Sequence, residues 1–246
     1  MLPRLTIPGL FVTGTDTGVG KTVVASAIAD HFRRRGLRVG AFKPAASGCN
    51  VESDGGLTSE DAERLRAAIG DRFSSRQICP ELFAEPLAPA VAARRAGRQI
   101  NWPNVRAMLL QIVSESDVIV IEGAGGIHSP IDDRTTILTL IRALALPTLC
   151  ITRPSLGTLN HTVLTVDALR AARVECAGVV INRFPMRDPT VAEMTSREEI
   201  ERLGGGPVRC VVPEAYFEGY AIPPAIAESI DSVDWSRLAR LERARA

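Results

Sequence analysis

Residues 11–22 read FVTGTDTGVGKT and carry the clearest chemical signature in the chain. An apolar run leads into a glycine-bearing loop, and the loop ends in Gly20, Lys21 and Thr22, where a helical pattern begins. Such a loop brings backbone N–H groups onto phosphate oxygens, its lysine can reach the β- and γ-phosphates, and its hydroxyl can ligate Mg²⁺. The stretch predicts a nucleotide phosphate site; an ordinary strand-turn-helix connection is the alternative.

The spacing within this loop is unusual. The common pattern places its first glycine at position 15, where this chain has Thr15. Gly14 stands one residue earlier, so the loop is a long variant.

A second chemical stretch, residues 117–126, reads DVIVIEGAGG. Four consecutive β-formers predict a strand buried on both faces, and Glu122 ends it. A buried carboxylate is costly unless water, a charged partner or a metal satisfies it. We therefore expect Glu122 to ligate Mg²⁺ or to anchor one of its waters. The small residues 123–126 allow the backbone to lie close to phosphate or substrate.

Another carboxylate, Asp61, belongs to the polar group 58–61 that opens a helical pattern. Two interpretations stay open for it. One is that it caps this helix, as Ser, Thr and Asp commonly do. The other is that it supplies a carboxylate to the magnesium held by the loop threonine.

Three further groups follow predicted strands, at the edge where ligands bind in open parallel sheets. Lys43 follows the strand expected at 37–42 and is predicted to act on the ligand, the alternative being a solvated loop lysine. Asn182 ends the strand expected at 174–182, a good place for an amide to read the edge of an adenine. Residues 157–160 start a helical pattern, whose N–H groups form either a carboxylate-sized site or a plain helix cap.

These side chains need a sheet that carries them to one edge. Strand-like runs alternate with segments of helical periodicity, so we expect one α/β domain over residues 1–246. Its architecture should be a three-layer sandwich with a mostly parallel central sheet, like that of P-loop NTPases. Residues 50–57 are expected to form a mobile loop, and 83–89, with two prolines, a rigid loop rather than a central strand or helix. A further helix is expected within 223–246.

Composition narrows the class of partner. The chain is 46% apolar, enough for one buried sheet, and its net charge of +1 offers no field for nucleic acid or an anionic membrane. The C-terminal arginines are expected to form a solvated face; they are Arg237, Arg240, Arg243 and Arg245. Five cysteines without a Cys-x-x-Cys pair favour reduced thiols in the cytoplasm. We see no signal peptide and no bilayer-spanning run, so a soluble protein is expected.

Other catalytic machinery is not evident in the sequence. The three histidines share no metal-ligand spacing, and no Gly-x-Ser-x-Gly motif suggests a nucleophilic serine. Two lysines, one hydroxyl and two carboxylates remain at the ligand edge. That set suits phosphoryl transfer, which depends on positioning and charge neutralisation.

Taken together, the motifs resemble those of the dethiobiotin synthetase family of biotin biosynthesis. In order and spacing the matching segments are GTDTGVGKT (14–22), KPAASG (43–48), FAEPLAP (83–89), EGAGG (122–126), LGTLNH (156–161) and Asn182. The resemblance covers about residues 10 to 215, and it accounts for the long loop. It implies an ATP-dependent ring closure, in which CO₂ forms a carbamate on one amine of 7,8-diaminopelargonate. ATP then phosphorylates the carbamate, and the second amine closes the ureido ring.

The resemblance also implies roles for individual residues. Lys43, Lys21 and Thr17 would be catalytic, and Thr22, Asp61 and Glu122 would ligate Mg²⁺. The ATP site would comprise Gly18, Val19, Gly20, Lys21, Thr22, Val23, Asp61, Glu122, Gly123, Ala124, Gly125, Asn182, Arg183, Val212, Pro213 and Glu214. The substrate would contact Thr17, Lys43 and Ser47 and, from the neighbouring subunit of a homodimer, Gly157, Thr158, Leu159 and Asn160.

Some positions depart from the family pattern. Gly18 stands where some members have glutamate, Ala90 where members often have histidine, and residues 127–129 continue the glycine run unusually. Two other functions are alternatives. A partitioning-type ATPase switch would need a loop lysine where this chain has Asp16. An amide ligase related to the cobyrinate synthetases would need a glutamine-hydrolysing domain, for which the chain is too short.

Overall fold

The computed structural model describes residues 2–241. Its central sheet has six strands in the order β10-β9-β8-β1-β7-β2, and all neighbouring pairs run parallel. The strands are β1 (Gly9–Gly14), β2 (Val39–Phe42), β7 (Val118–Glu122), β8 (Thr148–Thr152), β9 (Cys176–Phe184) and β10 (Val208–Pro213). The expected mostly parallel sheet is confirmed.

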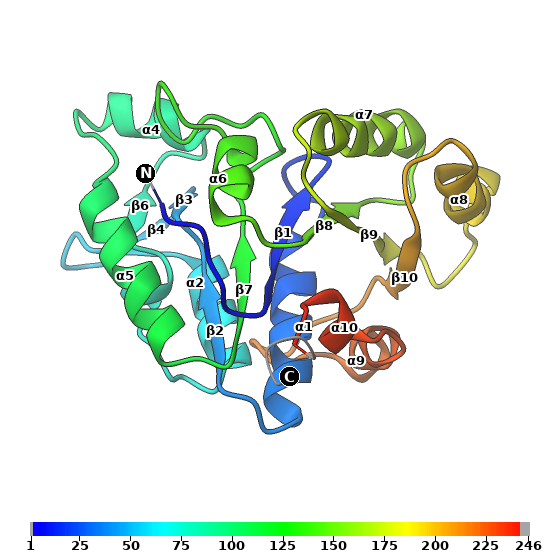
Figure 1. Ribbon diagram of the computed structural model, residues 1–246, viewed down its shortest axis with the longest axis horizontal. Helices are drawn as coiled ribbons and strands as arrows, with labels where there is room; N and C mark the ends of the chain where they lie inside the picture. The colour runs from blue at the N-terminus through cyan, green and yellow to red at the C-terminus, as the bar shows by residue number, and fades with distance from the viewer. Residues whose placement is uncertain (1, 242–246) are drawn as a thin grey trace.

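Helices pack on both sides of this sheet. Figure 1 shows α7 on one side and α1, α9 and α10 on the other, which gives the expected three layers. The helices are α1 (Lys21–Arg34), α2 (Glu60–Ala68), α3 (Ser75–Ile78), α4 (Pro89–Arg95), α5 (Trp102–Ser114), α6 (Ile137–Leu144), α7 (Thr158–Ala171), α8 (Val191–Arg202), α9 (Pro224–Asp231) and α10 (Trp235–Leu238). None of the helices among residues 2–241 is long and apolar enough to cross a membrane.

The sheet is held by burial on both faces. Every residue of β1, β2, β7 and β8 is buried, as expected for apolar parallel strands between helices. The register of β2 on β7 pairs Phe42 with Ile121. The residues that follow these two, Lys43 and Glu122, therefore emerge side by side at the carboxyl edge.

Two stretches expected to be loops contain regular structure. Residues 50–57 are predicted to form a mobile loop; the loop is wrong at its two ends, where β4 (Asn50–Val51) pairs antiparallel with β5 (Leu57–Thr58), and its mobility stays a prediction. Within 83–89, Phe83 ends β6 (Glu81–Phe83), which pairs with β3 (Ala45–Ser47) outside the central sheet. Pro89 begins α4. A proline is tolerated at a helix start because its missing N–H would have no helical partner there.

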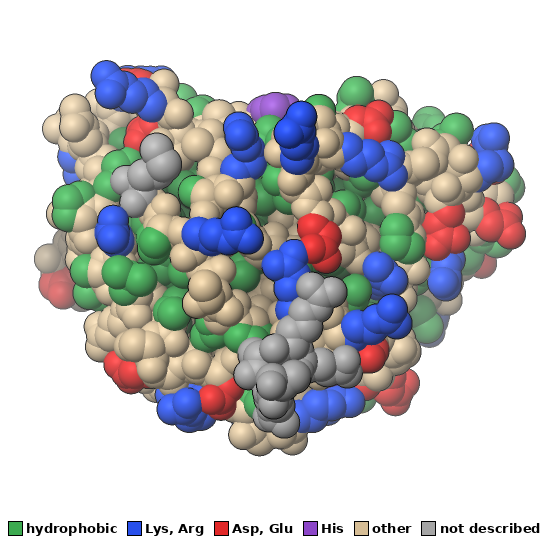
Figure 2. All heavy atoms as spheres, in the orientation of Figure 1, with side chains coloured by type: hydrophobic (Ala, Val, Ile, Leu, Met, Phe, Trp, Pro, Cys, Tyr) green, Lys and Arg blue, Asp and Glu red, His purple; other side chains and the backbone are tan. Residues whose placement is uncertain are grey.

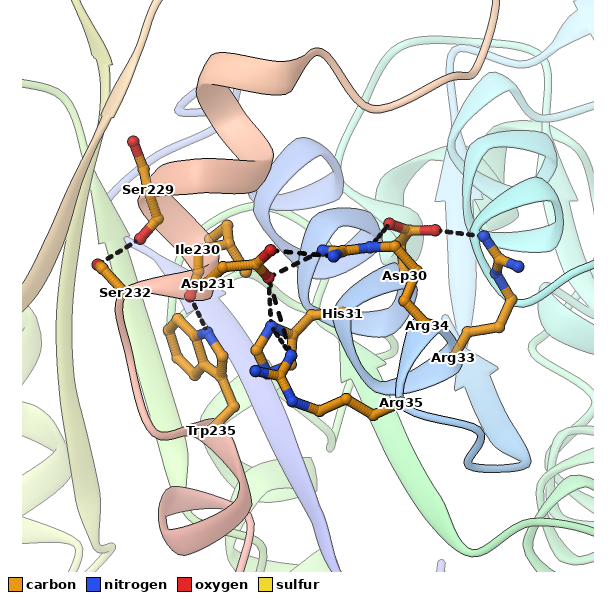
Figure 3. Close-up of polar contacts among 10 residues, drawn as sticks. All are labelled: Asp30, His31, Arg33, Arg34, Arg35, Ser229, Ile230, Asp231, Ser232 and Trp235. Carbon is orange, nitrogen blue, oxygen red and sulfur yellow. Dashed lines mark hydrogen bonds and ion pairs between the residues drawn. The ribbon is translucent and has the colours of Figure 1, made fainter.

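The C-terminal segment returns to the first helix. Figure 3 shows Asp231 of α9 beside His31 and Arg34 of α1. In place of one terminal helix there are two short ones, α9 and α10, separated by residues 232–234. Arg237 is exposed and Arg240 pairs with Glu175, whereas the predictions for Arg243 and Arg245 lie outside the described residues. On the face drawn in Figure 2, basic and acidic side chains are interspersed.

Candidate functional site

A cavity of about 500 Å³ opens at the carboxyl edge of the sheet. Polar and charged side chains from the loop after β1, the end of β2, α2 and the end of β7 meet there. Its lining comprises Thr17, Gly18, Gly20, Lys21, Thr22, Val23, Lys43, Ala46, Ser47, Glu60, Asp61, Arg64, Glu122, Ala124, Gly125, Asn182, Arg183, Pro213, Glu214, Ala215, Phe217 and Ile226. Ligands of open parallel sheets bind at this edge.

Gly20 and Asn182 fix the shape of the phosphate loop. Gly20 has φ 87°, and a Cβ there would lie 2.0 Å from Nδ2 of Asn182. The same nitrogen donates to the carbonyl of Val19 at 2.9 Å. Only glycine fits so close an approach in this backbone conformation. Asn182 thus holds the loop, a contact that the sequence did not indicate; its predicted adenine contact stays a prediction.

Lys21 is buried at the start of α1, and its Nζ donates to the carbonyl of Asp16 at 2.9 Å. The loop therefore folds over its own lysine. Burial, opposed by Glu122, lowers the pKa of Lys21. Thr17 lies exposed at the tip of the same loop and faces the cavity.

Lys43 bridges two carboxylates. Its Nζ lies 2.6 Å from Oδ2 of Asp61 and 2.6 Å from Oε1 of Glu122. Lys43 is 4% exposed and Glu122 is 1% exposed. Burial alone would lower the pKa of Lys43, but the charges of Glu122 and Asp61 outweigh it and raise the pKa above its usual value. Lys43 is therefore a buried cation within reach of the cavity.

Thr22 meets the same two carboxylates. Its Oγ1 lies 2.7 Å from Oδ1 of Asp61 and 2.9 Å from Oε1 of Glu122. The cap of α2 is Ser59, whose Oγ accepts from the N–H of Ala62, so Asp61 is not needed as the cap. This settles which residue caps the helix.

Glu122 also presents an unsatisfied atom. Its Oε2 is buried and has no hydrogen-bond partner among residues 2–241. An orphaned carboxylate oxygen beside a second carboxylate and a hydroxyl fits a hard divalent cation, which prefers oxygen ligands. The donor set of Thr22, Asp61 and Glu122 therefore suits Mg²⁺.

Comparison with known proteins connects this geometry to a family. A family model described as an AAA domain matches residues 8–216. The ATP-dependent dethiobiotin synthetase BioD of Anaeromyxobacter dehalogenans is 45% identical over 203 residues, 79% of this chain and 89% of its own length. That of Bacillus velezensis is 35% identical over 237 residues, 95% and 98% of the two chains.

The chain belongs to the dethiobiotin synthetase family.

Solved structures show the same fold at greater distance. The septum site-determining protein MinD of Pyrococcus horikoshii, complexed with Mg-ADP, superposes with a TM-score of 0.56 at 17% identity, covering 100% of this chain and 99% of that one. A ParA family ATPase of Chlorobium tepidum gives 0.55 at 18% identity, covering 93% and 98%. At such identities the likeness shows the P-loop NTPase-like fold alone. It lends no support to the partitioning-type alternative.

In this dethiobiotin synthetase family member most predicted site residues line one cavity, but some do not. Val19 and Val212 are buried, and a Cβ at Gly123 would point toward Ile137 and Phe11. The four residues expected to hold the substrate carboxylate lie apart from the cavity, at the N-terminus of α7. There the Thr158 hydroxyl lies 2.8 Å from that of Thr152 in a buried threonine cluster.

The cavity also contains residues that the sequence did not indicate. They are Ala46, Glu60, Arg64, Ala215, Phe217 and Ile226. Arg64 had one available signal, because it stands three residues after Asp61 and shares its helix face. Phe217 had none, because it lies in a segment without regular structure.

Proposed function

We propose that this chain closes the ureido ring of dethiobiotin from 7,8-diaminopelargonate and CO₂, using ATP and Mg²⁺. The observation that supports this best is the buried ammonium of Lys43, held 2.6 Å from both Glu122 and Asp61 beside the phosphate loop. A fixed cation at that place can stabilise charge that develops during phosphoryl transfer. Membership of the dethiobiotin synthetase family names the reaction.

The proposed reaction has three steps. One amine of the diamine adds to CO₂ and gives a carbamate. A carbamate oxygen attacks the γ-phosphorus of ATP, so that ADP leaves and a carbamic-phosphoric anhydride forms. The second amine attacks the carbamoyl carbon, the C–O bond to phosphate breaks, and inorganic phosphate leaves with closure of the ring.

The predicted site residues have separate proposed roles. Lys21 and the loop N–H groups hold the ATP phosphates, while Lys43, Thr17 and Ser47 surround the carbamate. Thr22, Asp61 and Glu122 would hold Mg²⁺, which neutralises phosphate charge when bound. The adenine base of ATP would lie toward the residues at the ends of β9 and β10, which are Asn182, Arg183, Val212, Pro213 and Glu214.

We propose a homodimer with shared sites, because the N-terminus of α7 lies outside the cavity of its own chain. In the dimer, residues 157–160 of one subunit would hold the substrate carboxylate in the site of the other. Mixing two inactive variants tests this. Lys43→Ala removes the cation, and Asn160→Glu places a like charge beside the substrate carboxylate.

Shared sites predict that equal amounts of the two variants, refolded or exchanged together, regain about a quarter of the wild-type sites. Each variant mixed with itself is the control and should stay inactive. Sites complete within one subunit would regain nothing on mixing.

The reaction itself is tested with purified protein, ATP, Mg²⁺, the diamine and bicarbonate. We expect dethiobiotin by mass spectrometry together with ADP and phosphate, and no product when any one component is omitted. Absence of dethiobiotin with all four present would refute the proposed activity.

The five cysteines, all within residues 2–241, are free thiols, and on that basis we propose a cytoplasmic location.

A further inference from the structure

Arg64 joins α2 to the segment that closes one side of the cavity. It lies one turn after Asp61, and both side chains line the cavity. The Cζ of Arg64 lies 4.5 Å from the ring centroid of Phe217 and 5.5 Å from that of Tyr220. Both rings come from residues 214–223, which connect β10 to α9 without regular structure.

The aromatic rings are the main partners of this guanidinium. The side chain of Arg64 is only 12% exposed, and its Nη1 is buried without a hydrogen-bond partner among residues 2–241. Its Nη2 donates to Glu60 at 3.1 Å, but Glu60 is 68% exposed. An ion pair of that kind contributes little. Contact with the ring faces is what holds the buried cation in place.

We propose that Arg64, Phe217 and Tyr220 form a clamp that positions the base-side wall of the nucleotide cavity. Glu214, Ala215 and Phe217 line that wall, and the clamp ties the middle of their segment to α2. Arg64 is thus a positioning residue for the nucleotide. The inference rests on the proposed binding of ATP in this cavity, and it goes beyond the roles assigned to the phosphate loop and the carboxylates.

The clamp separates the base end of the nucleotide from the phosphate end. The phosphate end depends on Lys21 and Thr22, whose side chains hydrogen-bond to Asp16 and to Asp61. Releasing residues 214–223 should therefore weaken binding of a ligand that has a base and ribose. A ligand made only of phosphates should be unaffected.

Equilibrium binding with two probes tests this directly. Arg64→Ala and Phe217→Leu are each expected to raise the Kd for Mg-ATP about three- to tenfold, the effect of losing a partly desolvated cation–π pair. The Kd for inorganic tripolyphosphate should stay within about twofold in both variants. The Kd of the double variant for ATP should not exceed that of the single variant with the higher Kd, because the two residues act as one unit. Arg64→Lys, which keeps a cation, should recover part of the loss.

Matched controls lie close by. Arg66→Ala removes another α2 arginine, one paired with Glu63 and Asp71, and Tyr216→Ala removes an aromatic ring that is 89% exposed. Both should leave the ATP Kd unchanged. The clamp is refuted by an unchanged ATP Kd in the folded Arg64→Ala and Phe217→Leu proteins, by additive losses in the double variant, or by equal weakening of tripolyphosphate. Because binding is read without turnover, failure of the ring-closing reaction would leave this result intact.

Discussion

The ammonium of Lys43 lies 2.6 Å from Oε1 of Glu122, although 79 positions separate the two residues in the chain. They are neighbours because β2 and β7 pair in parallel with Phe42 opposite Ile121. Lys43 is therefore the first residue beyond β2 and Glu122 the last residue of β7, on the same edge. A charged pair so deeply buried is stable only as a pair, since either charge alone would carry its full desolvation cost.

Removal of the Lys43 ammonium should nearly abolish turnover and leave ATP binding in place. We expect Lys43→Ala to reduce kcat about 10²- to 10³-fold, the usual cost of losing one group that stabilises developing charge. Steady-state kinetics and ATP calorimetry measure the two effects separately. Unchanged turnover would remove Lys43 from its proposed role.

Neutralising Glu122 should weaken the response to magnesium. Glu122→Gln keeps the shape of the side chain but removes one of two carboxylates around Thr22. The Mg²⁺ concentration for half-maximal activity should rise at least about tenfold, a loss seen even for outer-shell partners of metals. Glu85→Gln, at a carboxylate outside the cavity that pairs with Arg95, is the control. Equal magnesium dependence in all three proteins would contradict the assignment.

Substitutions at two glycines of the phosphate loop distinguish the cost of a strained backbone conformation from that of a steric clash. Gly18 and Gly20 both have positive φ, but a Cβ at Gly18 meets nothing within 4 Å. Gly18→Ala should lower the free energy of unfolding by about 1–2 kcal/mol, because the alanine must adopt the left-handed conformation. Gly20→Ala should lower Tm further, because its Cβ strikes Asn182.

The double variant Gly20→Ala/Asn182→Ala tests the cause of that difference. It removes the atom that the new Cβ would strike, and we expect it to unfold at a higher temperature than Gly20→Ala alone. Equal Tm values for Gly18→Ala and Gly20→Ala would show that the close contact with Asn182 has no effect on stability.

Acid should destabilise the contact between α1 and α9. Burial lowers the pKa of His31. The hydrogen bond to Asp231 acts in the opposite direction, and the charge of Arg35 lowers this pKa further (Figure 3). The unfolded chain therefore binds more protons around His31, and stability falls as pH drops below the usual histidine value of about 6.5. Hydrogen bonds from Arg34, and then from His31, lower the pKa of Asp231 to about 2. Its stabilisation is present above about pH 4 and is lost as pH falls toward 2.

Urea midpoints between pH 7.5 and pH 5 measure the histidine contribution. The wild-type midpoint should fall over this range, and the fall should be smaller in His31→Gln. His161→Gln changes an exposed histidine and should keep the wild-type slope. An unchanged slope in His31→Gln would assign the acid sensitivity elsewhere.

Much of the site could be predicted because its signals are local. Glycine spacing followed by Lys21 and Thr22 marks a phosphate loop, and an apolar run that ends in Glu122 or Lys43 marks a strand tip. The contacts of Asn182 and Arg64 could not be predicted in this way. Asn182 holds the loop from another strand, and Arg64 meets aromatic rings of the C-terminal segment.

The sequence by itself determined the α/β class, the phosphate loop, and the residues that stand at the ends of buried strands. Periodicity and turn chemistry depend on a few neighbouring residues, so they can be recognised in the sequence without a structure. The tertiary structure alone decided that Lys43 would lie between Glu122 and Asp61, and that the start of α7 would lie outside its own cavity. Those outcomes depend on strand order and register, which join segments far apart in the chain and leave no local pattern.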